Sequence, residues 1–476
     1  MLFKSYSAIP HVGVVLLLTL NLPAQIKDNK LIQKAQSGDL PAMLKLAEQY
    51  ESGNGSKSDP VEAEHWYERA AHTGDPMAQT KVALFYSRGI GVQKDPATAA
   101  RWLMRAAASG FVPAQVNLAI AYLNGIGVER STDAALHWLQ QSAAKGSADA
   151  VGILGAMYLE GHGVPADHSK ALQLNQQAAK QGSAIAQCNL GMIYEREIGV
   201  TKDLRAAEDW YRRAAKQGNP DGEYQLGRFL LYKHDGDKAE AVRLLHHAAE
   251  QGNLKAQFSL GLLHERGWAV PQSYSEALRW YSQAAEAGSL EAQLNLGSLY
   301  EHGRGVRQNY RESFRWYSQA AEDGLIAAQW NVAVAYEKGL GVEQNYEKAA
   351  YWYRRGADAG DSDAQERLGE LFYMGMGANK DRPAAIFWLT KAANQGNVNA
   401  TLSLGKVLSD DAASNDQRVE AITWFEIARR RGAEPGSILT KAQSRVSPAE
   451  RQSAVKDADQ WLAVHLNALQ TSRGSF

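Results

Sequence analysis

The stretch that decides the fold is residues 292–324, which read AQLNLGSLYEHGRGVRQNYRESFRWYSQAAEDG. A second stretch starts 36 residues later, at 328–360, and reads AQWNVAVAYEKGLGVEQNYEKAAYWYRRGADAG. Both carry a Gly-x-Gly-Val run and a Trp-Tyr pair at the same distances from the initial alanine. A sequence period of roughly 20–50 residues is typical of repeat solenoids, so the sequence predicts a solenoid.

The period extends through most of the chain. With the initial alanine taken as position 1, successive repeats start at Ala42, Ala78, Ala114, Ala150, Ala186, Gly222, Ala256, Ala292, Ala328, Ala364 and Ala400. The step is 36 residues except between Gly222 and Ala256, where it is 34. Eleven matches in one register favour a single solenoid over the roughly two to four separate domains that a chain of this length would otherwise suggest.

Each repeat predicts two helices. At about 100° per residue, positions 1, 5, 8 and 9 share one apolar face of the first helix, and position 6 is small enough for a neighbouring helix to approach closely. The glycines of Gly-x-Gly-Val suit a left-handed helix end and a turn, as at Gly125, Gly161 and Gly339. The second helix carries Trp-Tyr and ends at a glycine. One repeat alone would expose its apolar face to water, and stacking buries it.

The pattern Ala-x-x-x-Leu-Gly-x-x-Tyr-x-x-Gly-x-Gly-Val, followed by Ala-x-x-Trp-Tyr-x-x-Ala-Ala-x-x-Gly, resembles the Sel-1-like repeat (SLR) family, a relative of tetratricopeptide repeats. The resemblance covers residues 29–434. It implies an all-α fold, a right-handed α/α superhelical solenoid of about eleven 36-residue helix-turn-helix repeats. It also implies work as a scaffold or adaptor in protein complexes, often exported in bacteria.

The two ends of the chain depart from the repeat. We expect residues 1–24 to be a signal peptide, 25–434 the solenoid and 435–476 a C-terminal helical cap and tail. The run Ser447-Pro448-Ala449-Glu450 predicts a capping box that starts the capping helix. Within the solenoid, the repeat from Gly222 lacks the Gly-x-Gly-Val loop, and Glu197 replaces the first loop glycine in another repeat.

The N-terminus resembles an export signal. Lys4 precedes the apolar run VGVVLLLTL at 12–20, and Leu22-Pro23-Ala24 resembles a cleavage site. The run is too short to span a bilayer, which takes about 20 residues, and no other segment is a transmembrane candidate. We therefore expect a periplasmic or secreted protein. The residue after the cut would be Gln25 and not cysteine, so we do not expect a lipoprotein. The alternatives are a short uncleaved anchor and a cytoplasmic adaptor with a wrongly assigned start.

Composition and motifs give no case for catalysis. Lys plus Arg is 51 and Asp plus Glu is 52, which gives no electrostatic reason to bind nucleic acid. The single cysteine, Cys188, excludes an internal disulfide framework and a cysteine-based metal site. Ser142-x-x-Lys145 matches a motif of penicillin-recognising enzymes, but Ser142 stands at a repeat alanine and no Lys-Thr-Gly accompanies it. His246 and His247 are adjacent and point in different directions on a helix.

We therefore expect no enzyme, no cofactor and no metal. The resemblance still leaves a β-lactam-binding or β-lactamase-like enzyme open as an alternative, because some secreted SLR proteins have been linked to β-lactams. Those proteins carry paired cysteines, and this chain does not.

Position 3 offers the candidate binding site. It lies near 200° on the helical wheel, opposite the predicted core face, and should face the inner groove of the superhelix. Four consecutive repeats carry large apolar residues there, which we name the position-3 stripe: Tyr224, Phe258, Leu294 and Trp330. Exposed aromatic residues in a groove are suitable anchors for a protein or peptide partner. The alternative is that these side chains pack against adjacent first helices.

Overall fold

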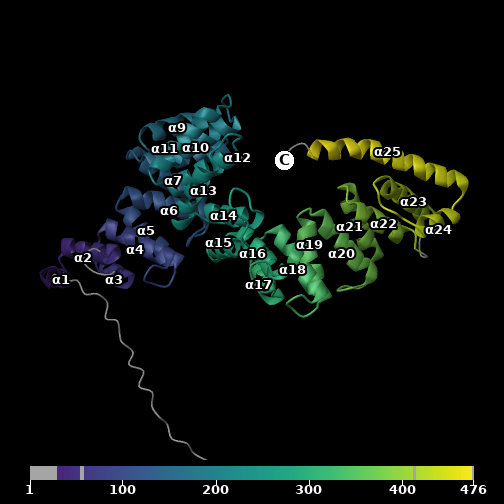
Figure 1. Cartoon of the computed structure of the whole chain (residues 1–476), viewed down its shortest axis with the longest axis horizontal. Coiled ribbons are helices and arrows are strands. Elements are labelled where there is room, and N and C mark those ends of the chain that lie inside the picture. Colours follow the sequence, from purple (N-terminus) through teal and green to yellow (C-terminus); the bar gives the residue numbers. More distant parts are fainter. Residues whose placement is uncertain (1–28, 54–57, 411–413, 474–476) are drawn as a thin grey trace, which may run out of the picture. The chain divides into compact units, whose positions relative to one another are not determined.

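The computed structural model describes residues 29–53, 58–410 and 414–473, and within them it contains helices and no strands (Figure 1). The predicted signal peptide, residues 1–24, lies outside the described residues. No helix in the described part of the chain is long and apolar enough to cross a membrane. The chain forms two compact units, Met1–Gly222 and Glu223–Phe476. The division falls inside the repeat that lacks the loop glycines.

The first unit starts with α1 and continues as antiparallel helix pairs. Its helices are α1 (Asn29–Gln36), α2 (Leu40–Ser52), α3 (Pro60–His72), α4 (Pro76–Arg88), α5 (Pro96–Ala108), α6 (Val112–Asn124), α7 (Thr132–Ala144), α8 (Ala148–Glu160), α9 (His168–Lys180), α10 (Ala184–Arg196) and α11 (Leu204–Lys216). Every helix from α3 to α11 has 13 residues, so the regular spacing of the sequence becomes a regular spacing of helices.

The second unit continues the same pattern to the C-terminal cap. Its helices are α12 (Pro220–Tyr232, which begins in the first unit), α13 (Lys238–Glu250), α14 (Leu254–Arg266), α15 (Tyr274–Glu286), α16 (Leu290–His302), α17 (Tyr310–Glu322), α18 (Ile326–Lys338), α19 (Tyr346–Asp358), α20 (Ser362–Met374), α21 (Arg382–Asn394), α22 (Val398–Leu408), α23 (Asn415–Arg430), α24 (Ser437–Ser444) and α25 (Pro448–Arg473). The predicted all-α solenoid of helix pairs is confirmed.

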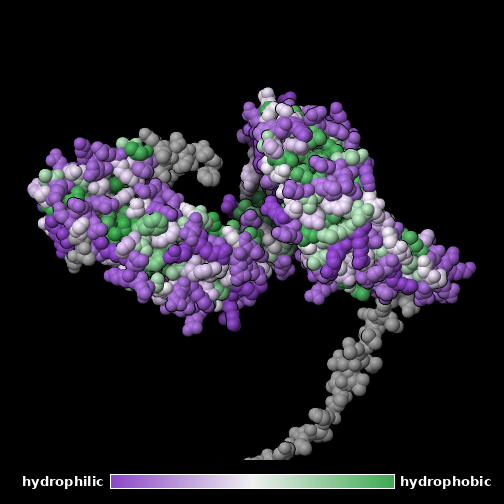
Figure 2. All heavy atoms as spheres, turned by 180° about the vertical axis from the view of Figure 1, so that it is seen from behind, coloured by the Kyte–Doolittle hydropathy of each residue, from purple (hydrophilic) through white to green (hydrophobic). Residues whose placement is uncertain are grey.

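Three of the four predicted core positions of α16 are buried, whereas the fourth, Tyr300 at position 9, is half-buried. Ala292, Leu296 and Leu299 are at most 1% exposed. They pack against Tyr281 and Ala284 of the preceding pair, so each repeat closes the core of its neighbour. Hydrophobic side chains still reach the surface in short patches between hydrophilic ones on the face drawn in Figure 2. Stacking has therefore buried most of the apolar surface that a single repeat would expose.

Glycine shapes both ends of the inter-helix loop. The first loop glycine caps the first helix in the left-handed region, as at Gly339 with φ 71°, and Glu197 keeps the same conformation with φ 59°. The second loop glycine lies against the preceding repeat. A Cβ on Gly341 would lie 2.1 Å from the carbonyl oxygen of Tyr310, the first residue of the preceding second helix. Gly305 meets Tyr274 in the same way. The loop of each of these repeats thus rests on backbone of the repeat before it.

The described chain ends in two helices, α24 and α25, the second of which starts with a capping box. Ser447 and Glu450 form the capping box that starts α25, in which Ser447 Oγ accepts from the Glu450 backbone N–H and Glu450 accepts from that of Ser447. α25 packs on α23 (Figure 1) through a cluster that includes Ala454, Ala458 and Leu462. The short helix α24 between them had no sequence signal.

Candidate partner-binding surface

The position-3 stripe is half-buried rather than open. Its four residues lie on α12, α14, α16 and α18, and none is fully exposed. The ring of Phe258 lies 5.7 Å from that of Tyr281, and Trp330 lies 5.1 Å from Tyr353. Leu294 packs on a cluster that includes Tyr317. The stripe is therefore only partly exposed, because the second helix of the same repeat covers one side of Phe258, Leu294 and Trp330.

The tyrosine that lies beneath this stripe stands at position 26, the second residue of the Trp-Tyr pair. Where position 6 is glycine, the tyrosine ring packs against it: a Cβ on Gly297 would lie 2.6 Å from the ring of Tyr317. Its hydroxyl donates to a glutamate at position 10 of the same repeat. The pairs are Tyr67 with Glu51 (2.7 Å), Tyr211 with Glu195 (2.7 Å), Tyr281 with Glu265 (2.8 Å), Tyr317 with Glu301 (2.7 Å) and Tyr353 with Glu337 (2.8 Å).

Position 10 and position 26 vary together within this one chain. Wherever position 26 is tyrosine, position 10 is glutamate. The six other repeats combine Leu103 with Ser87, Leu139 with Leu123, Asn175 with Leu159, Leu245 with Leu231, Leu389 with Tyr373 and Phe425 with Ser409. A buried tyrosine hydroxyl requires an acceptor, and a largely buried glutamate requires a donor. The tyrosine and the glutamate therefore occur together in the same repeats. The repeat alignment contained this signal, and our sequence reasoning missed it.

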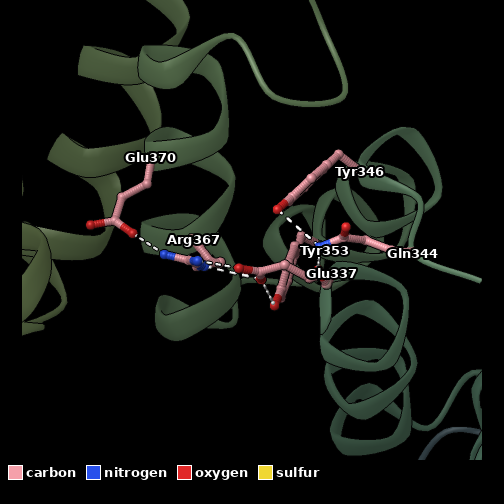
Figure 3. A network of polar contacts seen from close by, with 6 residues as sticks. All are labelled: Glu337, Gln344, Tyr346, Tyr353, Arg367 and Glu370. Carbon is pink, nitrogen blue, oxygen red and sulfur yellow. Dashed lines mark hydrogen bonds and ion pairs between the residues drawn. The ribbon is translucent and has the colours of Figure 1, made fainter. Parts of the chain in front are cut away.

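Position 4 of the following repeat can add a cation to this pair. Lys81 Nζ lies 2.9 Å from Glu51, and Arg367 forms a two-point ion pair with Glu337 (Figure 3). Arg367 also binds Glu370, so it bridges two carboxylates. Burial raises the pKa of Glu337, but the hydrogen bonds from Arg367 and Tyr353 outweigh it and hold the pKa below its ordinary value. The arrangement locks α18, α19 and α20 together.

A pocket opens beside Glu301, the position-10 glutamate of the repeat just before that of Glu337. The pocket has a volume of about 590 Å³ and its lining combines two stripe residues, Leu294 and Trp330, with the carboxylates of Glu301, Asp361 and Asp363. Asn331, at position 4, also lines it. The structure thus brings half of the position-3 stripe into one pocket, whereas Tyr224 and Phe258 do not line it.

A second row on the first helix is structural. The position-2 glutamines donate through Nε2 to a backbone carbonyl eight residues earlier, near the end of the preceding second helix. The bonds run from Gln79, Gln115, Gln187, Gln257, Gln293, Gln329 and Gln365, at 3.0–3.5 Å. These bonds join successive repeats.

The residues that the sequence offered as candidates for catalysis or metal binding make structural contacts. Ser142 is fully buried and donates to Gln115, and Lys145 Nζ donates to the carbonyl of Gly110. His247 pairs with Glu223, whereas His246 lies beside Trp280. Burial raises the pKa of the Cys188 thiol to about 12. Within the described ranges, no three His, Cys, Asp or Glu side chains gather where they could hold a metal ion.

The repeats match the family model of the Sel1 repeat. The model matches residues 40–75, 76–111, 112–147, 148–183, 184–219, 220–253, 254–289, 290–325, 326–361 and 362–397. The match covers more than half of the chain, and the protein belongs to the Sel1 repeat family. It includes the shortened repeat, 220–253, and it stops before the pair α22 and α23, which forms an eleventh repeat with a modified loop.

The solved structure of one similar protein agrees with this assignment, and a second similar structure is known. The chain is 32% identical to c5321, a protective antigen present in uropathogenic Escherichia coli strains that displays an SLR fold, with coverage of 94% of this chain and 97% of that chain and a TM-score of 0.56. It is 29% identical to a Sel1 repeat protein from Oxalobacter formigenes, over 79% of this chain and 89% of that chain, with a TM-score of 0.44. No curated protein matches the sequence.

Proposed function

We propose that this Sel1 repeat protein is an exported scaffold that binds one or more protein partners through the position-3 stripe of its second unit. Repeat solenoids commonly serve as protein-interaction scaffolds, because stacked repeats present an extended surface of similar side chains. The observation that carries the proposal is the pocket at Leu294 and Trp330, whose lining combines these two apolar residues with carboxylate and amide side chains. Partner-binding hot spots favour such partly enclosed aromatic residues over fully exposed ones.

The proposed location is the periplasm or the exterior of the cell. It is supported by the charged, apolar and small-residue segments of residues 1–24. The similar protein c5321 is a protective antigen, which supports an exported location and leaves two roles open, one toward host proteins and one in envelope or polysaccharide-export assembly. The mass of the protein isolated from its own cells tests the location. Cleavage after Ala24 is expected, and an intact N-terminus would favour the cytoplasmic adaptor.

Photo-crosslinking tests the binding surface. Truncating Phe258 or Trp330 would disturb buried tyrosines, so an added crosslinker is a better probe than a deletion. We would place p-benzoylphenylalanine at Ala327, which is exposed and lines the pocket, and at Tyr351, which is 57% exposed and does not line it. The expected result is a crosslinked partner from position 327 and none from position 351. Equal products from both positions, or none from 327, would refute binding at this surface.

A further inference from the structure

We propose that the pocket beside Glu301 and Trp330 receives a lysine or arginine side chain of the partner protein. This specificity deepens the proposed function and rests on it. Two repeats of this chain already hold a cation at the equivalent place.

In these two repeats, the position-10 glutamate binds a cationic side chain from position 4 of the next repeat. Lys81 Nζ lies 2.9 and 3.0 Å from the two carboxylate oxygens of Glu51 and 5.5 Å from the ring of Tyr67. Arg367 reaches Glu337 in the same way from position 4 of the next repeat (Figure 3). In both cases a long cationic side chain lies against a Tyr–Glu pair, so the geometry accepts an ammonium or a guanidinium group.

Glu301 has the same Tyr–Glu pair and lacks the cation. Its Oε2 accepts from Tyr317 at 2.7 Å, but position 4 of the next repeat is Asn331, whose short neutral side chain cannot form the ion pair. No lysine or arginine in the described part of the chain forms an ion pair with Glu301. The neighbouring Glu265 differs, because Arg304 lies 3.9 Å from it.

The pocket has the size and charge to hold the missing cation. Its volume of about 590 Å³ lies within the roughly 300–1,000 Å³ of ligand pockets. Asp361 and Asp363 add two carboxylates to Glu301, and His302 is the only basic residue in the lining. Asp361 accepts a hydrogen bond from the backbone of Ala364 through Oδ1 and so caps α20, and Asp363 accepts one from Asn397 through Oδ1.

The apolar part of the lining selects an organic cation. Leu294 and Trp330 can cover the methylene stem of a lysine or arginine, while an indole face attracts the charged head. A metal ion fits poorly, because no group of three or more ligand side chains within the described residues could hold one. An anionic side chain would be repelled by the three carboxylates, and a neutral side chain would leave their negative charge uncompensated. The partner is therefore expected to insert a basic residue flanked by apolar ones.

The test compares charged residues with neutral ones of the same shape. Mixtures of heptapeptides with a fixed central residue would be passed over the immobilised full chain, and the retained peptides counted by mass spectrometry. The central residue would be lysine, arginine, norleucine or citrulline, the last two being neutral counterparts. We expect retention of the lysine and arginine mixtures to exceed that of the neutral ones about tenfold at low salt. Equal retention of charged and neutral mixtures, or no retention, overturns the proposal.

One substitution fills the site from within. Asn331→Arg should place a guanidinium on Glu301 as Arg367 does on Glu337, and it should abolish the preference for basic peptides. Asn331→Gln, with no charge, is the matched control and should keep the preference. Should Asn331→Arg fail to fold, Glu301→Gln must reduce the preference instead. A folded Asn331→Arg protein with unchanged preference refutes the cation site. If crosslinking from position 327 persists in that protein, the scaffold function stands without it.

Discussion

Replacing Arg367 with methionine should loosen α18, α19 and α20 in a pH-dependent way. Arg367 supplies the charge that compensates Glu337, whose side chain is 9% exposed (Figure 3). Breaking a fully buried ion pair costs about 3–5 kcal/mol, because one charge is left without a partner. The Arg367 side chain is 31% exposed, so water can partly replace it. We therefore expect a loss of about 2 kcal/mol of local stability at pH 7.5.

The sign of the pH dependence follows from the pKa of Glu337. In the native protein this pKa is below its ordinary value, so the pair contributes stability above the unfolded pKa and loses it as the pH falls through the folded pKa. In the Arg367→Met protein, burial remains and raises the pKa of Glu337. The carboxyl then takes up a proton on folding, and the deficit relative to the native protein should shrink as the pH falls from about 7.5 to about 5.

Amide hydrogen exchange is the suitable assay, because a repeat array need not unfold in a single step. A loss of about 2 kcal/mol should speed exchange in α18–α20 about 30-fold, with little change in α22–α23. The double variant Arg367→Met with Glu337→Gln should recover most of the protection, since a neutral amide still accepts from Tyr353. A deficit that is constant or larger at pH 5, or that persists in the double variant, would refute the reasoning.

Three further changes test other parts of the fold. Burial, and then Glu68, raises the pKa of Glu64 to about 7, so the stability of the first unit should fall as the pH rises from 4.5 to about 7, and a melting series should show that Glu64→Gln removes this slope. Gly341→Ala should lower the melting temperature far more than Gly339→Ala, because both need a positive φ but only the first collides with backbone, and equal shifts would contradict this. Ser142→Ala should leave the reaction with a fluorescent penicillin unchanged at background, because the hydroxyl is fully buried; labelling lost on substitution would revive the β-lactam alternative.

The sequence predicted the repeated part of the fold well because the period is a property of the chain itself. Each Ala, Gly and Trp-Tyr recurs in a fixed register, so the helix pairs, the glycine caps at Gly125 and Gly339, and the capping box at Ser447 follow from local rules. α24 was missed because it has no side-chain cap and belongs to no repeat.

The candidate site was predicted less well because a helical wheel treats one helix at a time. Position 3 lies opposite the face defined by positions 1, 5, 8 and 9, and it therefore seemed open. In the structure the position-26 tyrosine of the second helix reaches around and covers it, as Tyr353 does for Trp330. The accompanying glutamate at position 10 and the occasional cation at position 4 depend on contacts between helices. Only a comparison of positions across the repeats could have revealed them.

The glycine loops give the array a direction. Gly341 rests on the backbone at Tyr310, which belongs to the repeat before it in the chain, and Gly305 rests in the same way on Tyr274. A nascent chain emerges from its N-terminus. The backbone on which each loop rests is therefore synthesised before the loop itself. Each arriving hairpin can then dock on a finished neighbour, and translation order and assembly order coincide. A chain truncated at its C-terminal end would keep the preceding repeat on which each remaining loop rests. A chain truncated at its N-terminal end would lose that support for its first remaining loop.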